Sequence, residues 1–131
     1  MIVRQLGDLA GTDREVRAPT WTSRRLLLAR DGCRFSLHDT VIHAGTTTEL
    51  CYRNHVEAVY CAEGSGRLVD PESSTVHELG PGVLYVLDGH ERHRVEAETD
   101  LRMVCVFDPP VTGTEVHDAD GAYPLLEGAA E

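Results

Sequence analysis

Short strand-like runs separated by turn residues fill most of the chain between residues 24 and 108. Alternating or β-branched residues are broken by Gly, Pro, Asp and Asn into runs at 24–29, 34–43, 47–52, 56–61, 66–70, 75–79, 82–87, 93–97 and 102–107. Regular short strands with turn signals between them predict an antiparallel sandwich or barrel. No long stretch has a helical period, and residues 5–15 are expected to hold only a short turn. The predicted fold class is therefore all-β.

Length and charge restrict the class of protein further. A chain of 131 residues suits one domain with a single core. Its formal net charge of −10 argues against nucleic-acid binding, which needs a basic face. Charges interrupt the first sixteen residues, so secretion is not expected. No apolar run approaches the roughly 20 residues of a membrane helix. We therefore expect a cytoplasmic protein that does not insert into membranes.

Four cysteines occur without CxxC spacing: Cys33, Cys51, Cys61 and Cys105. Without an export signal they are expected to be reduced thiols, and a CxxC zinc site is excluded.

The strand pattern stops after Phe107, where two consecutive prolines cannot continue a sheet ladder. We therefore place a barrel at about residues 24–108 and a tail at 109–131, within one domain of residues 1–131. A polar, Gly-rich tail is often disordered. Its polar cluster supports a second interpretation, a C-terminal lid over the mouth of the barrel. That cluster comprises Glu115, His117, Asp118 and Tyr123.

A glycine-bounded stretch has the spacing of the first metal motif of cupins. Gly45 is followed by five residues, a pair of ligand positions at 51 and 53, then Glu57 and Gly64. The usual histidine pair is replaced by Cys51 and Arg53. Cys51 could ligate as a thiolate, whereas a permanently cationic arginine cannot. This motif therefore retains Glu57 as its expected ligand.

The second cupin motif begins at Gly82 and places His93 at its histidine position. Asp88, His90 and Ala97 replace the usual Pro, Gly and Asn. Two ligands are too few to hold a divalent metal firmly, so a third is needed. Strand parity and a turn at 88–93 bring Tyr85 near His93. A Glu, Tyr, His set is rich in oxygen and suits iron better than structural zinc.

Each of these three residues also has an ordinary interpretation. Glu57 would be a solvated strand residue, Tyr85 a core aromatic, and His93 a turn histidine. The joint spacing favours the metal site over these interpretations.

Four blocks in order resemble the ectoine synthase family. They are "WTSRRLLLARDGCRFSLHDT", "NHVEAVYCAEGSG", "LYVLDGHERH" and "RMVCVFDPPVTGTEVHDADGAYP". The resemblance runs from Met1 to about Pro124. It implies a cupin barrel (a double-stranded antiparallel β-helix, or jelly roll), usually a homodimer. It also implies an iron-dependent hydro-lyase, in which N-γ-acetyl-L-2,4-diaminobutyrate cyclises to ectoine with loss of water. The implied iron ligands are Glu57, Tyr85 and His93.

The resemblance also implies substrate contacts: Trp21, Ser23, Arg24, Thr40, Tyr52, Cys105, Phe107, Glu115 and His117. Of these, Tyr52, Glu115 and His117 are the candidate catalytic residues. Met103, Cys105 and Phe107 alternate along one face of their strand, so all three can enter one cavity. A substrate carboxylate favours a guanidinium, which Arg24 or Arg25 could provide.

Two of these assignments conflict with strict alternation. Tyr52 lies five residues before Glu57, and a turn at Arg53-Asn54 would be needed to reset the parity. Thr40 faces away from Leu37 and Val41 in a regular strand. Two other classes also stay open: another metal-dependent cupin acting as an oxygenase or isomerase, and a non-catalytic ligand-binding cupin.

Overall fold

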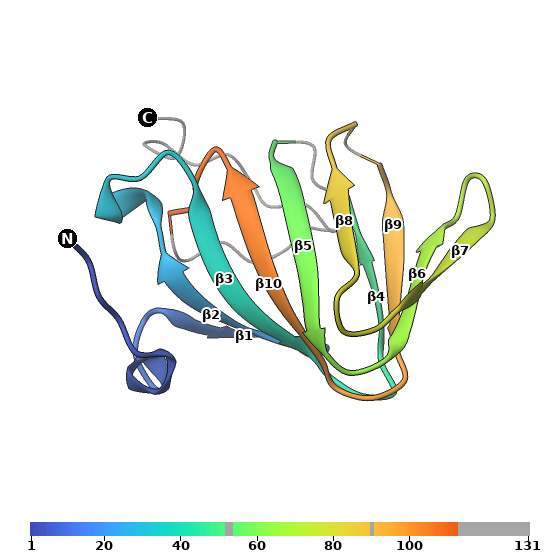
Figure 1. The fold of residues 1–131 in the computed structure, drawn as a ribbon, viewed down its shortest axis with the longest axis horizontal. Coiled ribbons are helices and arrows are strands. Elements are labelled where there is room, and N and C mark those ends of the chain that lie inside the picture. The colour runs from blue at the N-terminus through green and yellow to red at the C-terminus, as the bar shows by residue number, and fades with distance from the viewer. Residues whose placement is uncertain (52–53, 90, 113–131) are drawn as a thin grey trace.

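Two antiparallel sheets and two short 3-10 helices make up the computed structural model, which describes residues 1–51, 54–89 and 91–112 (Figure 1). The elements, in chain order, are η1 (Leu6–Leu9), β1 (Glu15–Arg17), β2 (Trp21–Leu27), η2 (Ala29–Asp31), β3 (Ser36–Ile42), β4 (Thr47–Leu50), β5 (Val56–Glu63), β6 (Gly66–Asp70), β7 (Thr75–Leu79), β8 (Leu84–Leu87), β9 (His93–Ala97) and β10 (Leu101–Asp108).

The strands form a six-stranded sheet in the order β1-β2-β3-β10-β5-β8 and a four-stranded sheet in the order β4-β9-β6-β7. Every paired strand is antiparallel to its neighbour. Figure 1 shows the larger sheet curving from β1 to β8, with the smaller sheet beside and behind it. The predicted all-β class is confirmed, and η1 lies where a short turn was expected.

Buried side chains from both sheets form one core. Alternation along β10 buries Leu101, Met103, Cys105 and Phe107, as predicted for the last three. The smaller sheet contributes apolar residues such as Leu50, Leu68 and Val95. None of the helices formed by the described residues has the length and apolar character of a membrane span.

The inner face of β3 is more polar than the sequence pattern suggested. Ser36, His38 and Ile42 are buried, and Thr40 lies on the same face. The face with Phe35 and Leu37, which is the more apolar side of the strand by sequence, points outward, and Phe35 is 40% exposed. The register decides this, because Thr40 pairs with Met103 of β10 and therefore shares its inward direction.

Sheet structure starts earlier than residue 24, at Glu15, and buried structure continues beyond residue 108. Pro110 and Val111 are fully buried. The N–H of Ala29 donates to the carbonyl of Val111 (2.9 Å), and the N–H of Val111 donates to Ser36 Oγ (3.2 Å). The first residues of the expected tail are thus built into the barrel.

Candidate metal and substrate site

A small cavity lies between the two sheets, and Glu57 and Tyr85 are among the residues that line it. The other lining residues come from both sheets and are Trp21, Thr40, Ile42, Thr48, Leu50, Met103, Cys105 and Phe107. Four predicted substrate contacts (Trp21, Thr40, Cys105 and Phe107) therefore share one cavity with two of the three predicted metal ligands.

Strand register explains why these residues meet. Glu57 pairs with Phe107 on β10 and with Leu87 on β8, while Val59 pairs with Tyr85. Opposed residues in antiparallel strands share a face, and so do residues two positions apart. Glu57, Tyr85 and Phe107 therefore point to the same side of the six-stranded sheet.

The carboxyl of Glu57 is 4% exposed and is held in a low-dielectric environment. Burial raises its pKa from 4.5 to about 8, although a hydrogen bond with Cys105 acts to lower it. The Cys105 thiol has a pKa well above its ordinary value because of burial and the nearby Glu57, while a hydrogen bond with Thr40 lowers it. Glu57, Cys105 and Thr40 therefore form one contiguous polar cluster.

Tyr85 lies between this cavity and a second pocket, which it lines together with His93. The Tyr85 and His93 ring centroids are 6.4 Å apart. Burial, followed by the charge of Glu57, raises the pKa of Tyr85 well above 10.0. Burial lowers the pKa of His93, which favours the neutral imidazole, the form that binds metals.

The donor set fits a metal that accepts oxygen and one imidazole. Among the described residues, no three His, Cys, Asp or Glu side chains gather closely enough to hold an ion, so a site here depends on the phenol of Tyr85. Burial raises the pKa of both the Glu57 carboxyl and the Tyr85 phenol, and the charge of Glu57 adds to the rise for Tyr85; a bound cation would act in the opposite direction on both. Glu57, Tyr85 and His93 are thus suited to bind a cation that neutralises them.

Strand β2 separates the arginine candidates. Trp21, Ser23 and Arg25 are buried, with Trp21 in the cavity lining. Arg24 lies on the opposite face, where its guanidinium forms an ion pair with Asp39. The structure therefore does not bring Arg24 to the cavity, and Arg25 is the arginine of this pair that enters the barrel.

Two histidines missed by the sequence reasoning flank Phe107. The ring centroid of Phe107 lies 4.9 Å from that of His38 and 5.8 Å from that of His55. Burial and then the charge of Arg25 lower the pKa of His38 well below 6.5. The sequence could have identified His55, because it lies two residues before Glu57 and so points to the same side. The sequence could not have identified His38, because the register of β3 decides which way its side chain points.

Three predicted site residues, Tyr52, Glu115 and His117, lie outside the described residues.

The sequence matches the family model for ectoine synthase over residues 1–127. This chain belongs to the ectoine synthase family. An L-ectoine synthase of Rhodococcus jostii is 54% identical over 97% of this chain and 98% of its own. An L-ectoine synthase of Thermobifida fusca is 54% identical over 96% of this chain and 94% of its own.

Solved structures support the same assignment. The crystal structure of an ectoine synthase from P. lautus superposes with a TM-score of 0.87 at 52% identity, covering 96% of this chain and 91% of that one. The polyketide cyclase RemF from Streptomyces resistomycificus has a TM-score of 0.69 at 25% identity, covering 92% and 89%. The expected cupin barrel is confirmed.

Proposed function

We propose that the chain is a hydro-lyase that converts N-γ-acetyl-L-2,4-diaminobutyrate to ectoine. The observation that carries this proposal is the family match over residues 1–127, together with the cavity that joins Glu57 to Tyr85. The α-amino nitrogen of the substrate forms a bond to the acetamide carbon, and the acetamide oxygen leaves as water. The product is a cyclic amidine.

Glu57, Tyr85 and His93 hold an iron ion in this proposal. When bound, the iron supplies a Lewis acid for the acetamide oxygen. Burial of the three side chains supports the assignment, because Glu57 and His93 are 4% and 3% exposed and Tyr85 is largely covered. A buried carboxylate is stable only when a proton or a cation compensates its charge.

The cavity lining orients the substrate and excludes water from it. Trp21 covers the methyl and methylene groups, and Thr40 and Cys105 offer polar contacts beside Glu57. Phe107 forms an apolar wall against which the chain of the substrate folds. We assign the substrate carboxylate to Arg25 instead of Arg24. Arg25 is not in the cavity lining itself, but it is fully buried on the inner face and pairs across the sheet with His38, whose ring contacts the cavity residue Phe107.

Proton transfer is assigned to residues that follow β4 and β10 in the sequence. Glu115 or His117 takes the ammonium proton and later protonates the departing oxygen. Tyr52 is the third residue assigned to catalysis. Ring closure requires the nitrogen to be held within about 3–3.5 Å of the carbonyl carbon.

Direct turnover tests the proposal. Iron(II)-loaded protein is mixed with N-γ-acetyl-diaminobutyrate and the product is followed by chromatography, with Glu57→Ala and Glu63→Ala compared. Glu63 ends the same strand but is exposed. We expect ectoine from the wild type and from Glu63→Ala, and no ectoine from Glu57→Ala. A wild type that binds iron and forms no ectoine would return the function to the oxygenase, isomerase or binding alternatives.

We further propose that the active form is a homodimer. Strand β8 is the outer strand of the larger sheet, and an unpaired edge favours association. Its outward residues Leu84 and Val86 are 63% and 48% exposed and adjoin Tyr60, which is 48% exposed. A second copy of the chain that covers this surface would bury them.

Light scattering at several concentrations tests the dimer. Leu84→Lys is expected to shift the population to the monomer. Val76→Lys is the matched control, because Val76 is 52% exposed on β7, in the other sheet. Equal masses for Leu84→Lys and wild type would place the interface elsewhere.

We also place the protein in the cytoplasm. The four cysteines, all in the described part of the chain, form no disulfide with one another. That agrees with a reducing compartment. Fractionation of producing cells, with activity measured in each fraction, checks the assignment.

A further inference from the structure

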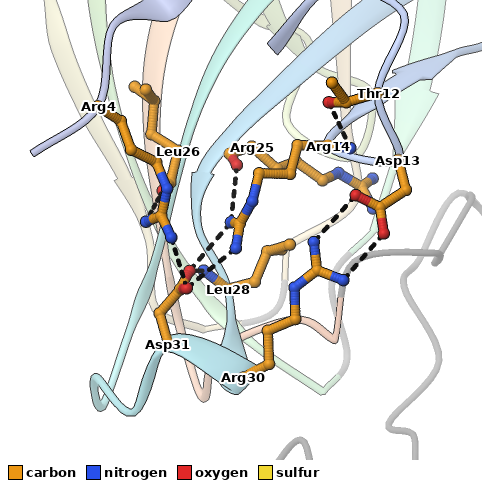
Figure 2. Close-up of polar contacts among 9 residues, drawn as sticks. All are labelled: Arg4, Thr12, Asp13, Arg14, Arg25, Leu26, Leu28, Arg30 and Asp31. Carbon is orange, nitrogen blue, oxygen red and sulfur yellow. Dashed lines mark hydrogen bonds and ion pairs between the residues drawn. The ribbon is translucent and has the colours of Figure 1, made fainter. Parts of the chain in front are cut away.

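A cluster of charged side chains holds the outer side of the barrel where β2 ends (Figure 2). Both Asp31 oxygens accept hydrogen bonds from arginines: Arg4 Nη2 and Arg14 Nη2 donate to Oδ1 (2.8 and 2.9 Å), and Arg14 Nη1 donates to Oδ2 (3.0 Å). We call Arg4, Arg14 and Asp31 the Asp31 clasp. The Asp31 side chain is only 7% exposed, so its ion pairs are better protected from solvent than surface pairs are.

The clasp also binds the backbone of β2 and of the turn that follows. Arg4 Nη1 donates to the Leu26 carbonyl (2.9 Å), and Arg14 Nη1 donates to the Arg25 carbonyl (3.3 Å). The N–H of Leu28 donates to Asp31 Oδ2 (2.9 Å). These contacts coincide with the register shift between Arg25 and Leu27 in the pairing of β2 with β3. The clasp therefore supports the backbone where regular pairing is interrupted.

Two features of the barrel interior depend on this stretch of backbone. The side chain of Arg25 extends inward from it, is fully buried, and acts electrostatically on His38. On the other side of Leu28, the N–H of Ala29 donates to the carbonyl of Val111. The outer contacts thus hold the backbone from which the Arg25 side chain extends, next to the residue whose N–H bonds Val111.

A neighbouring ion pair provides a contrast within the same region. Arg30 donates two hydrogen bonds to Asp13, each 3.0 Å long (Figure 2). Their side chains are 48% and 68% exposed. Neither side chain is hydrogen-bonded to the β2 carbonyls that the clasp holds. Exposed pairs of this kind contribute little to structure.

We propose that Asp31 is a positioning residue for the reaction. It aligns Arg4 and Arg14 on the Arg25 and Leu26 carbonyls, and through them it sets the place of the Arg25 guanidinium in the barrel. This inference rests on the proposed function, in which Arg25 receives the substrate carboxylate. A displaced guanidinium binds the carboxylate less well but leaves the metal ligands on β5, β8 and β9 in place.

The test compares Asp31→Asn with Asp13→Asn in iron-loaded protein, with three readouts: steady-state kinetics, iron content and amide hydrogen exchange. For Asp31→Asn we expect KM to rise about tenfold with kcat within about threefold of wild type, because misplaced binding groups weaken substrate binding. Exchange should accelerate at residues 24–29 and at Val111, with iron content unchanged. Asp13→Asn should match the wild type in all three readouts.

A lower melting temperature in Asp31→Asn, with wild-type KM and wild-type exchange at 25 °C, would overturn the proposal and leave the clasp a purely structural role. If Asp31→Asn does not fold, Arg4→Gln removes one arm only, and an unchanged KM together with unchanged exchange in that variant overturns the proposal equally. A wild type that makes no ectoine would instead refute the proposed function. The exchange comparison would then decide by itself whether the clasp holds the Arg25 backbone.

Discussion

At the scale of single residues, two glycines of the first metal motif differ in their surroundings. Gly45 has φ 76° and Gly64 has φ 97°, a region that L-residues rarely adopt. A Cβ on Gly45 would meet no atom within 4 Å. A Cβ on Gly64 would overlap the carbonyl of Asp100, in the turn before β10. Backbone packing therefore requires glycine at position 64, whereas at position 45 only the backbone dihedral angle favours it.

Gly64→Ala and Gly45→Ala should differ in the free energy of unfolding. We expect Gly45→Ala to cost about 1 kcal/mol, the penalty for a left-handed alanine. Gly64→Ala should cost at least about 3 kcal/mol, because the strand and the Asp100 turn must also move apart. Urea denaturation of the metal-free proteins measures both. Equal losses would show that backbone contact at Gly64 relaxes without cost.

The carboxyl of Asp31 should make the stability depend on pH in acid. Burial acts to raise its pKa, but hydrogen bonds from Arg14, Leu28 and Arg4 outweigh burial and lower the pKa from 3.8 to about 2. A lowered pKa in the folded state stabilises the protein above the unfolded pKa, and this contribution is lost as pH falls through the folded value.

Asp31→Asn should therefore be less stable than wild type by about 2 kcal/mol at pH 7. The difference should shrink between pH 4 and pH 2. Denaturant titrations at pH 7, 4 and 2.5 measure it, with Asp13→Asn as the control. A difference that stays constant to pH 2.5 would mean that the pKa of Asp31 is not lowered by the fold.

At the scale of elements, β10 connects the core to the site. It pairs with β3 and with β5, so its inner residues contact both neighbours. Alternation predicted that Met103, Cys105 and Phe107 share a face, and they do. The sequence of β3 did not predict its polar inner face, since the apolar residues Leu37 and Val41 suggested that their side of the strand would be the buried one. The pairing of β3 with β10 turns the other side inward.

Phe107→Ala should be far more damaging than Val106→Ala, although the two residues are adjacent on β10. Phe107 is 1% exposed between two imidazoles, whereas Val106 faces outward and is half-buried. We expect the free energy of unfolding to fall by about 3–5 kcal/mol in Phe107→Ala and by less than about 1 kcal/mol in Val106→Ala. Thermal unfolding and turnover measure both. Similar losses would contradict the observed direction of the two side chains.

At the scale of the whole molecule, the barrel ends later than the sequence suggested. The double proline marked a boundary at residue 109, yet Pro110 and Val111 are fully buried and tied to η2 and β3. Proline ends sheet pairing but does not prevent burial. The part of the tail that carries Glu115 and His117 therefore begins after an anchored segment.

Two truncations separate the anchor from the proposed catalytic tail. A chain ending at residue 112 is expected to fold with near wild-type stability, to bind iron and to form no ectoine. For a chain ending at residue 108, the free energy of unfolding should be lower by about another 2–4 kcal/mol, because Val111 is removed from the core. Circular dichroism, iron content and turnover measure these outcomes. Normal turnover by the longer truncation would remove Glu115 and His117 from the mechanism.

The sequence by itself determined most strand positions, the all-β class and the spacing that selects Glu57 and His93, because turn residues and alternation are local properties of a chain. Only the tertiary structure decided that Arg25 enters the barrel while Arg24 faces out, that the polar side of β3 is the inner one, and that Val111 belongs to the core. Alternation defines two faces of a strand but does not say which one is inside. That choice is made by the register with neighbouring strands and by the sheet packed opposite.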